Sequence, residues 1–434
     1  MFVLRILTLA IAAVTAPAFA QDCAGAAGGQ CTMLANGTRV QWDASLRLRG
    51  MYYDPTRFGV QGGVEDGYGL LRALGSVQLS RGRWQGYAQL GVHGEQGRAG
   101  GPGGTDQGAL DLQQGYVRWQ GEAFGLQIGR QEIPYGSSRI LSVRDGPNIR
   151  LAFDGVRGRW QNARWQVDAL ALRPVDNRPG AFDDRRDEAQ YLVGSYATRR
   201  GASTGNGVDL YLLGYGRDGA RFASASGDER RTTLGTRLFA RQPRWDANVE
   251  LVLQNGTLSR SQGSLDIRAW TVASDIGLRF PDVRLQPRLG IKADIASGDA
   301  NPNDGRLQTF NALYPKAAYF SEASLLAPAN LMDVQPTLTL TPRPGLSTEF
   351  GWQVAWKHRR NDAIYTTPTP LSAIPGSAGT ARRIGQQFKW ETTWKASPHW
   401  QWQGQLAWFE AGPGLRQSGG RNTLFASVVG AWQW

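Results

Sequence analysis

The sequence predicts an all-β fold, a transmembrane antiparallel β-barrel of about eighteen strands. Three observations predict it. Apolar and polar residues alternate with a period of two from Val40 to the last residue, the connections between alternating segments are short and long in turn, and many of the 16 tryptophans lie near segment ends. A barrel wall in a membrane has this pattern because one residue in two faces lipid and the next faces a polar interior.

The alternating segments are too long for an ordinary globular sheet. In Trp42–Leu48 the apolar residues lie on one face and the polar residues on the other. In 283–295 the alternation is strict over thirteen residues and places Arg284, Arg288 and Lys292 on the polar face. A globular strand averages about five or six residues, whereas a tilted membrane strand needs about nine to eleven. The length of these segments therefore favours membrane strands.

The same pattern recurs along the whole chain. Further strands are predicted near 68–80, 83–93, 112–120, 123–130, 153–161, 164–173, 190–199, 207–217, 231–241, 244–255, 266–280, 333–341, 346–357, 382–395, 399–410 and 422–434. Short turns are predicted at 81–82, 121–122, 162–163, 242–243, 281–282, 343–344 and 396–398, with 200–206 of intermediate length. Long connections are predicted at 54–67, 94–111, 131–152, 174–189, 218–230, 256–265, 298–332, 358–381 and 411–421.

This order of turns and loops is typical of bacterial outer-membrane barrels. Those barrels have short periplasmic turns, long extracellular loops and an even number of strands. The final predicted strand ends on the aromatic residue Trp434, as expected of the strand that closes a barrel. We therefore expect both termini in the periplasm, and outward-facing side chains in contact with the lipid of the outer membrane of a Gram-negative bacterium.

The first twenty residues read as a secretory signal peptide. A single cation, Arg5, precedes an apolar run over 6–14, and small residues at 18 and 20 suit a cleavage site. We expect three parts: a signal peptide at 1–20, a periplasmic N-terminal segment at 21–36 and the barrel at 37–434.

The only two cysteines, Cys23 and Cys31, lie close together in the predicted periplasmic segment. Disulfides persist in that compartment, so we expect a small loop-closing disulfide. A metal site is not predicted, because none of the three histidines is near these cysteines, and no cofactor is predicted.

Positive charge is concentrated on the strand faces assigned to the lumen. The chain has a formal net charge of +12 at pH 7, and removal of Arg5 leaves it basic. The predicted pore-lining cations are Arg47, Arg49, Arg72, Arg118, Arg157, Arg159, Arg237, Arg284, Arg288, Lys292, Lys357, Arg383 and Lys389. Positive side chains around an aqueous path concentrate anions, and arginine holds a carboxylate with two parallel hydrogen bonds. A solute with carboxylates is therefore expected.

These charges also have a structural interpretation. Any barrel lumen must be polar, and opposed basic and acidic side chains can form ion pairs that brace the wall, since charged clusters are often structural. The collective excess of positive charge is therefore better evidence for function than any single residue.

Two long connections carry unusual residues for extracellular loops. The segment 129–155 contains Arg130, Arg139, Arg144 and Arg150 among turn-forming residues. The segment 302–335 is too apolar to lie free in water, because an exposed apolar patch of this size would be adhesive. We expect one or both to fold into the barrel as a constriction or to lie over its mouth as a lid.

Three blocks of the sequence resemble the alginate export family of outer-membrane porins. They are GRQEIPYGSSRILSVRDGPNIRLAFDGVR at 129–157, VDALALRPVDNRPGAFDD at 167–184 and LQTFNALYPKAAYFSEASLLAPANLMDVQPTLTLTP at 307–342. The resemblance implies a monomeric barrel with an electropositive conduit for a polyuronate, working with periplasmic export proteins. Members of the family differ in solute, and no individual arginine is carried over from it. The two cysteines are not a feature that we associate with the family.

The leading hypothesis is passive outward conduction of an anionic, alginate-like polysaccharide. The alternative is an anion-preferring porin for uptake of small organic acids or other anionic solutes. An enzyme is not expected, because the available histidines, His93, His358 and His399, lack an obvious serine and aspartate constellation. Nucleic-acid binding is not expected either, because the arginines are spread through strands rather than gathered in one exposed motif.

Overall fold

The computed structural model describes residues 30–201, 205–316, 318–368 and 371–434. The predicted signal peptide and Cys23 lie outside the described residues. Cys31 lies in a short strand, β1 (Gln30–Met33), which pairs with the beginning of β2. The disulfide and the division of the chain at residue 36 therefore stay predictions.

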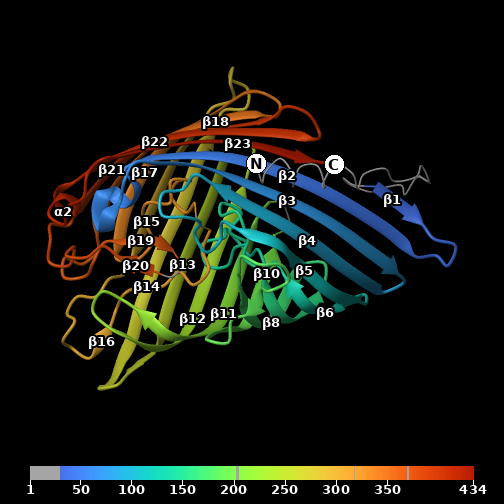
Figure 1. Ribbon diagram of the computed structural model, residues 1–434, viewed down its shortest axis with the longest axis horizontal. Coiled ribbons are helices and arrows are strands. Elements are labelled where there is room, and N and C mark those ends of the chain that lie inside the picture. The colour runs from blue at the N-terminus through green and yellow to red at the C-terminus, as the bar shows by residue number, and fades with distance from the viewer. Residues whose placement is uncertain (1–29, 202–204, 317, 369–370) are drawn as a thin grey trace.

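Within the described residues, eighteen long antiparallel strands form a closed barrel, in which each strand pairs with the next and the last pairs with the first (Figure 1). They are β2 (Arg39–Asp54), β3 (Asp66–Arg81), β4 (Trp84–Gln96), β5 (Gly108–Gln120), β6 (Phe124–Gln131), β7 (Phe153–Gln161), β8 (Trp165–Asp176), β10 (Gln190–Arg200), β11 (Gly207–Arg221), β12 (Ser226–Arg241), β13 (Trp245–Arg260), β14 (Gly263–Arg279), β15 (Arg288–Ala296), β17 (Leu331–Arg343), β18 (Leu346–Lys357), β21 (Arg383–Lys395), β22 (Trp400–Ala411) and β23 (Thr423–Gln433). The predicted fold class is confirmed.

The remaining elements are short and, apart from β1, lie in the connections at the long-loop end, on the left in Figure 1. They are η1 (Thr56–Gly62), β9 (Arg185–Arg186), β16 (Arg306–Leu307), β19 (Tyr365–Pro368), β20 (Leu371–Ala373) and α2 (Pro413–Arg416). Among the described residues, no helix has the length and apolar character needed to cross a membrane.

The barrel wall has an apolar outer face. Leu212, Leu234 and Leu253 lie side by side on β11, β12 and β13, with 51%, 55% and 46% of their surfaces exposed. The neighbouring residues Thr233 and Gln254 point into the barrel and are 0% and 1% exposed. An apolar exterior and a polar interior on the same strands are the signature of a wall that faces lipid.

Tryptophans border this apolar band. Trp270 pairs with Leu253 towards the long-loop end, and Trp245 begins β13 at the short-turn end. At the short-turn end Trp400 and Trp402 also lie outside, with stacked rings 5.9 Å apart. Aromatic rings at both edges match the interfacial girdles of transmembrane barrels.

Two predicted long connections, 218–230 and 256–265, are wrong. The strands β11 to β14 continue past the apolar band as two projecting hairpins, which turn at 222–225 and 261–262 (Figure 1). Their outward residues there are polar, for example Arg268 on β14. Because these strand ends lie beyond the lipid, their outward residues are polar, and their inward residues Leu258, Leu265 and Ile267 are apolar and buried, which reverses the pattern that identified the other strands.

The predicted strand 283–295 begins later than expected. The chain turns over 281–287, and β15 begins only at Arg288. Leu285 and Gln286 have φ values of 70° and 44°, which belong to the left-handed region and end an extended conformation. Arg284 therefore lies exposed in a turn, and its predicted place on the lumen wall is wrong.

The lipid-facing band predicts the effect of a buried charge. Leu251 lies outside on β13, between the levels of Trp270 and Trp245. We expect Leu251→Arg to lower the free energy of unfolding by about 2–4 kcal/mol, the cost of arginine near the bilayer midplane. Urea unfolding in lipid vesicles, followed by tryptophan fluorescence, measures it.

The matched control is Thr257→Arg, on the same face of the same strand but paired with Asp266 in the projecting hairpin. We expect this variant to lose no more than about 1 kcal/mol, as for arginine near an interface. Equal losses in the two variants would contradict the position of the band.

Candidate functional site

Both unusual connections fold into the barrel rather than over it. We call 132–152 inner loop 1 and 297–330 inner loop 2. The side chain of Asn148 in inner loop 1 is fully buried and donates its amide hydrogens to the carbonyl oxygens of Leu71 (2.9 Å), Gly94 (3.0 Å) and Asp106 (2.8 Å). This single side chain fixes inner loop 1 to two wall strands and to the connection 97–107.

Apolar packing explains the composition of the inner loops. Two clusters of buried side chains join the loops to the inner wall. One contains Ile140 and Leu141 of inner loop 1 together with Leu313 of inner loop 2, packed on β7, β8, β10, β11 and β13 to β15. The other packs Phe320 and Leu326 of inner loop 2 on β18 and β21 to β23. The barrel interior therefore covers the apolar surface that the sequence placed in a loop.

The two inner loops also bind each other. The backbone amide of Tyr314 donates to the carbonyl of Ile140 (3.0 Å), and that of Lys316 donates to the carbonyl of Ser138 (2.9 Å). The Arg144 guanidinium donates to the carbonyl of Pro315 (3.1 Å). The loops therefore narrow the lumen as one unit.

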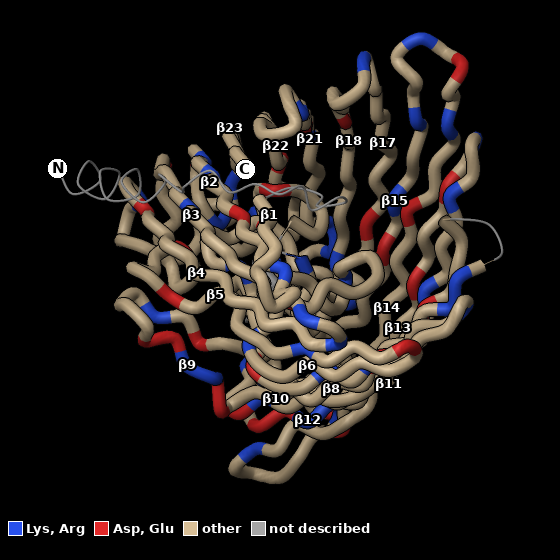
Figure 2. The backbone as a smooth tube through the Cα atoms, turned by 90° about the vertical axis from the view of Figure 1, so that its right-hand side faces the viewer, with Lys and Arg blue, Asp and Glu red and all other residues tan. Residues whose placement is uncertain are grey.

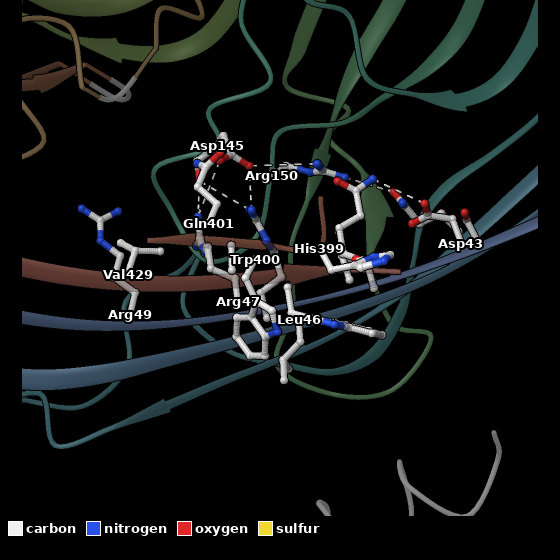
Figure 3. Close-up of a pocket in the computed structure, with 18 of the residues that line it drawn as sticks. Asp43, Leu46, Arg47, Arg49, Asp145, Arg150, His399, Trp400, Gln401 and Val429 are labelled. Atoms are coloured by element: carbon white, nitrogen blue, oxygen red, sulfur yellow. Dashed lines mark hydrogen bonds and ion pairs between the residues drawn. The ribbon is translucent and has the colours of Figure 1, made fainter. Parts of the chain in front are cut away.

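A cavity of about 830 Å³ lies between inner loop 1 and the wall, and it reaches the short turn 396–399 (Figure 3). We call it the vestibule. In the described part of the chain its lining carries five cations and four carboxylates, namely Arg47, Arg49, Arg72, Arg150 and Lys395 against Asp43, Glu132, Asp145 and Glu322. The lining has a small excess of positive charge.

Asp145 is the point at which inner loop 1 meets the wall cations (Figure 3). Its carboxylate lies 2.7 Å from the Arg72 guanidinium and 3.8 Å from that of Arg47. The Asp145 side chain is 62% exposed but enclosed by the barrel. Loss of bulk water would raise its pKa, yet the positive charges of Arg72 and Arg47 outweigh this and hold the pKa below its usual value.

Arg49 anchors both inner loops. Its guanidinium donates to the carbonyl oxygen of Gly146 in inner loop 1 (2.8 Å) and forms an ion pair with Glu322 in inner loop 2 (3.1 Å). Arg47 and Arg49 are 8% and 5% exposed. These two predicted pore-lining arginines thus hold the constriction in place.

Most of the other predicted cations form ion pairs with carboxylates. The wall pairs are Arg159–Asp168 (2.7 Å), Arg237–Asp209 (2.7 Å), Arg288–Asp246 (2.6 Å) and Arg288–Asp275 (2.7 Å). The pairs at inner loop 1 and its border are Arg130–Asp154 (2.9 Å), Arg139–Glu250 (3.4 Å) and Arg150–Glu132 (2.9 Å). The structural interpretation of these residues, in which ion pairs brace the wall, fits the geometry.

Arg118 and Arg157 differ from these residues. Both donate to the Gln127 side-chain oxygen, at 2.7 Å and 2.9 Å, and both are partly exposed. Neither has a carboxylate within ion-pair distance among the described residues. Together they leave positive charge uncompensated on β5 and β7.

A second group of cations surrounds the place where the inner loops meet. We call Arg139, Lys292, Lys316 and Lys389 the neck. Lys292 and Lys389 share the Glu349 carboxylate at 3.0 Å each. Lys316 is exposed in the lumen and has no ion pair with a described carboxylate. Enclosure by the protein lowers the pKa of Lys316, and the charges of Lys292 and Arg139 lower it further.

Sequence reasoning missed Lys316, because it treated the apolar character of 302–335 as the whole signal. One feature could have identified it: Lys316 is the only basic residue between Arg306 and Arg343. An isolated cation in an apolar segment that folds into a lumen has few neighbours to neutralise it.

Arg383 was predicted on the lumen face, and this is wrong. A bulge lies between β18 and β21, where Ala355 pairs with Gly385 and Trp356 pairs with Arg383. Directly paired residues share a face, so Arg383 faces outward with Trp356. Ile384 takes the inward position in its place, 1% exposed.

The three histidines lie in separate places: His93 in β4, His358 directly after β18 and His399 in a short turn. These positions alone do not test the expectation that the protein is not an enzyme, which stays a prediction.

Comparison with known proteins identifies the family. The family model described as alginate export matches residues 39–429. No curated protein matches this chain.

Solved structures with a similar fold are porins. Pseudomonas aeruginosa OccK8 (OprE) has a TM-score of 0.59 at 10% identity, covering 93% of this chain and 99% of that one. P. aeruginosa OpdK with vanillate has 0.59 at 12%, covering 91% and 98%. A BenF-like porin from Pseudomonas fluorescens Pf-5 has 0.61 at 10%, covering 93% and 100%. Identities this low show a shared fold alone.

The anchor of inner loop 1 predicts a change in conductance. We expect Asn148→Ala to weaken the attachment of the loop by about 1–3 kcal/mol, because three buried carbonyl groups lose their donor. Single-channel recordings in a planar bilayer should then show larger and noisier currents. The exposed Asn303 provides the control, since Asn303→Ala removes the same side chain from a turn of inner loop 2 where that side chain forms no hydrogen bond with a described residue. Identical current noise in Asn148→Ala and the unmodified protein would contradict the anchoring role.

Proposed function

Because the chain belongs to the alginate export family, we propose that this outer-membrane channel passively conducts an anionic, alginate-like polysaccharide out of the cell. The single observation that carries the proposal is the neck, where Lys316, exposed and without an ion pair to a described carboxylate, joins three cations that are paired with carboxylates at the place where the inner loops meet. Enclosed positive charge of this kind attracts anions, because low-dielectric walls focus the field.

The arrangement of cations along the barrel supports a polymer as the solute. Positive charge occurs at three places on the lumen side: in the vestibule, at Arg118 and Arg157 on the wall, and at the neck. A chain with a carboxylate on every sugar can contact several of these places at once. Lysine binds a carboxylate as a point charge rather than as a two-pronged clamp, and contacts that release easily favour conduction.

Uptake of small organic anions is the second candidate. The observation that favours it is the firm attachment of both inner loops inside the barrel. The similar fold solved with vanillate holds a small carboxylate, and the neck would attract such a solute equally well. We keep the monomeric state and the periplasmic export partners as proposals that follow from the family resemblance, and we propose no catalytic role.

The neck predicts the ion preference of the channel. We expect the protein to prefer chloride over potassium in a planar bilayer under a salt gradient, and Lys316→Gln to shift the reversal potential towards zero. Arg268→Gln is the matched control, since it removes one cation from the outer face of a projecting hairpin. Cation preference in the unmodified protein, or equal shifts in both variants, would overturn the role of the neck.

Blocking of the current separates the two candidates. We expect oligouronates of several sugars, added on the short-turn side, to block chloride current at lower concentration than glucuronate or benzoate does. A polymer gains from simultaneous contacts because its second contact is intramolecular. Block by the small acids at equal or lower concentration would instead support uptake of small anions.

A further inference from the structure

Three carboxylates meet at the long-loop rim of the barrel, away from the neck and the vestibule. Asp111 lies near the beginning of β5, and Asp183 and Asp184 lie in the connection between β8 and β9. Their ligand oxygens all lie within 4.8 Å of one another. Figure 2 shows acidic segments on both sides of the basic strand β9. Like charges this close repel, so the cluster needs a compensating cation.

Two oxygens of this cluster are buried without a hydrogen-bond partner. Asp111 is 6% exposed, and its Oδ2 has no partner in the described structure. The Oδ1 atom of Asp183 is also buried and has no hydrogen-bond partner in the described structure. An unsatisfied buried oxygen is costly, and an unpaired buried charge more so. Both atoms belong to residues of the cluster.

The nearby arginines do not compensate these carboxylates. The Arg130 guanidinium is engaged with Asp154, at 2.9 and 3.1 Å, and reaches Asp184 only at its backbone carbonyl, at 3.5 Å. The Arg178 guanidinium pairs with Asp176 at 3.4 Å.

The backbone holds the cluster in a fixed geometry. The amide of Ala109 donates to the carbonyls of Pro179 (3.2 Å) and Gly180 (3.1 Å), and that of Phe182 donates to the carbonyl of Leu110 (2.9 Å). The amide of Gly180 also donates to Asp183 Oδ2 (3.1 Å), and a Cβ atom at residue 180 would lie 2.4 Å from that oxygen. A side chain at residue 180 would therefore displace the Asp183 carboxylate.

We propose that Asp111, Asp183 and Asp184 bind one Ca²⁺ ion, which fastens the connection 177–189 to β5 at the rim of the barrel. The donor set is all oxygen and anionic, which suits a hard cation and not a thiolate- or imidazole-preferring metal. Ca²⁺ accepts irregular sets of carboxylates, carbonyls and waters, whereas Mg²⁺ requires a near-octahedral arrangement. The site lies on the side of the long loops, outside the conduction path.

Calorimetry tests the site directly. The detergent-solubilised barrel, free of lipopolysaccharide, is treated with a chelator and then titrated with CaCl₂. We expect one saturable site with a dissociation constant of about 10⁻⁵ to 10⁻³ M, typical of sensor and extracellular calcium sites. The double variant Asp183→Asn/Asp184→Asn should lose binding, and so should Asp111→Asn alone. Asp176→Asn, in the same connection but outside the cluster, should retain it.

Proteolysis gives a second readout that does not depend on heat of binding. Trypsin can cut after the exposed Arg185 and Arg186. Bound Ca²⁺ stabilises the folded form of the connection 177–189, so this segment opens less often for cleavage. Ca²⁺ at ten times its dissociation constant should slow cleavage about tenfold. The double variant should be cut at the same rate with and without Ca²⁺.

Several results would overturn the proposal. They are the absence of saturable Ca²⁺ binding to the unmodified barrel, equal affinity for Mg²⁺, and unchanged Ca²⁺ binding in the double variant. Retention of the heat-modifiable electrophoretic shift shows that each variant is folded, and removal of repelling charges should not unfold it. Channel selectivity is measured separately, so failure of the site and failure of the conduction proposal are distinguishable.

Discussion

The requirement that every backbone amide and carbonyl group find a partner in lipid determines the rest of this molecule. Strands satisfy it only when the sheet closes, as the pairing of β2 with β23 does here. A closed sheet of eighteen strands is wide enough to leave an aqueous channel that wall side chains cannot fill. The protein narrows that channel with two of its own connections, so the selectivity of the barrel depends on how those connections are held.

Connections that lie in a lumen bring polar backbone into a confined space, and the wall must satisfy it. The side chains that do so are long and cationic, because they reach across the gap and donate several hydrogen bonds at once. Arg49 shows the principle, since it serves the carbonyl of Gly146 and the carboxylate of Glu322 together. The excess of arginine in the strands therefore has a structural cause as well as an electrostatic effect.

The sequence predicted the strands correctly where lipid imposes alternation, and less well elsewhere. Leu234 and Leu253 alternate with buried polar neighbours because one face is in lipid. Around Arg268 the outward face is in water and the inward face is a buried apolar cluster, so the polarity of the two faces is reversed. The turn at 281–287 also alternates between apolar and polar residues, although it is not a strand, because apolar residues such as Val283 happen to be exposed there (52%). The sequence pattern therefore predicted a strand where the chain turns.

The functional residues were predictable from the sequence where they lie on regular strands, and not elsewhere. The lumen faces of Arg47 and Lys389 follow from strand period, but Lys316 lies in a loop with no period. Asp111 is separated from Asp183 and Asp184 by some seventy positions, so only the three-dimensional structure brings them together. A side chain displaced by a bulge, such as Arg383, is equally invisible to a period of two, because one inserted residue exchanges the faces.

The attachment of inner loop 1 also has a consequence for any anion that enters the vestibule. The carboxylate of Asp145 pairs with Arg72 at 2.7 Å and lies 3.8 Å from Arg47, and it is 62% exposed and therefore accessible to a solute. A uronate carboxylate has the same charge and the same geometry, so it competes with Asp145 for the same two guanidinium groups. Arg47, Arg49 and Asn148 hold the backbone of inner loop 1 through hydrogen bonds in which the Asp145 carboxylate takes no part. Competition for the Asp145 partners therefore displaces a side chain and leaves the loop in place.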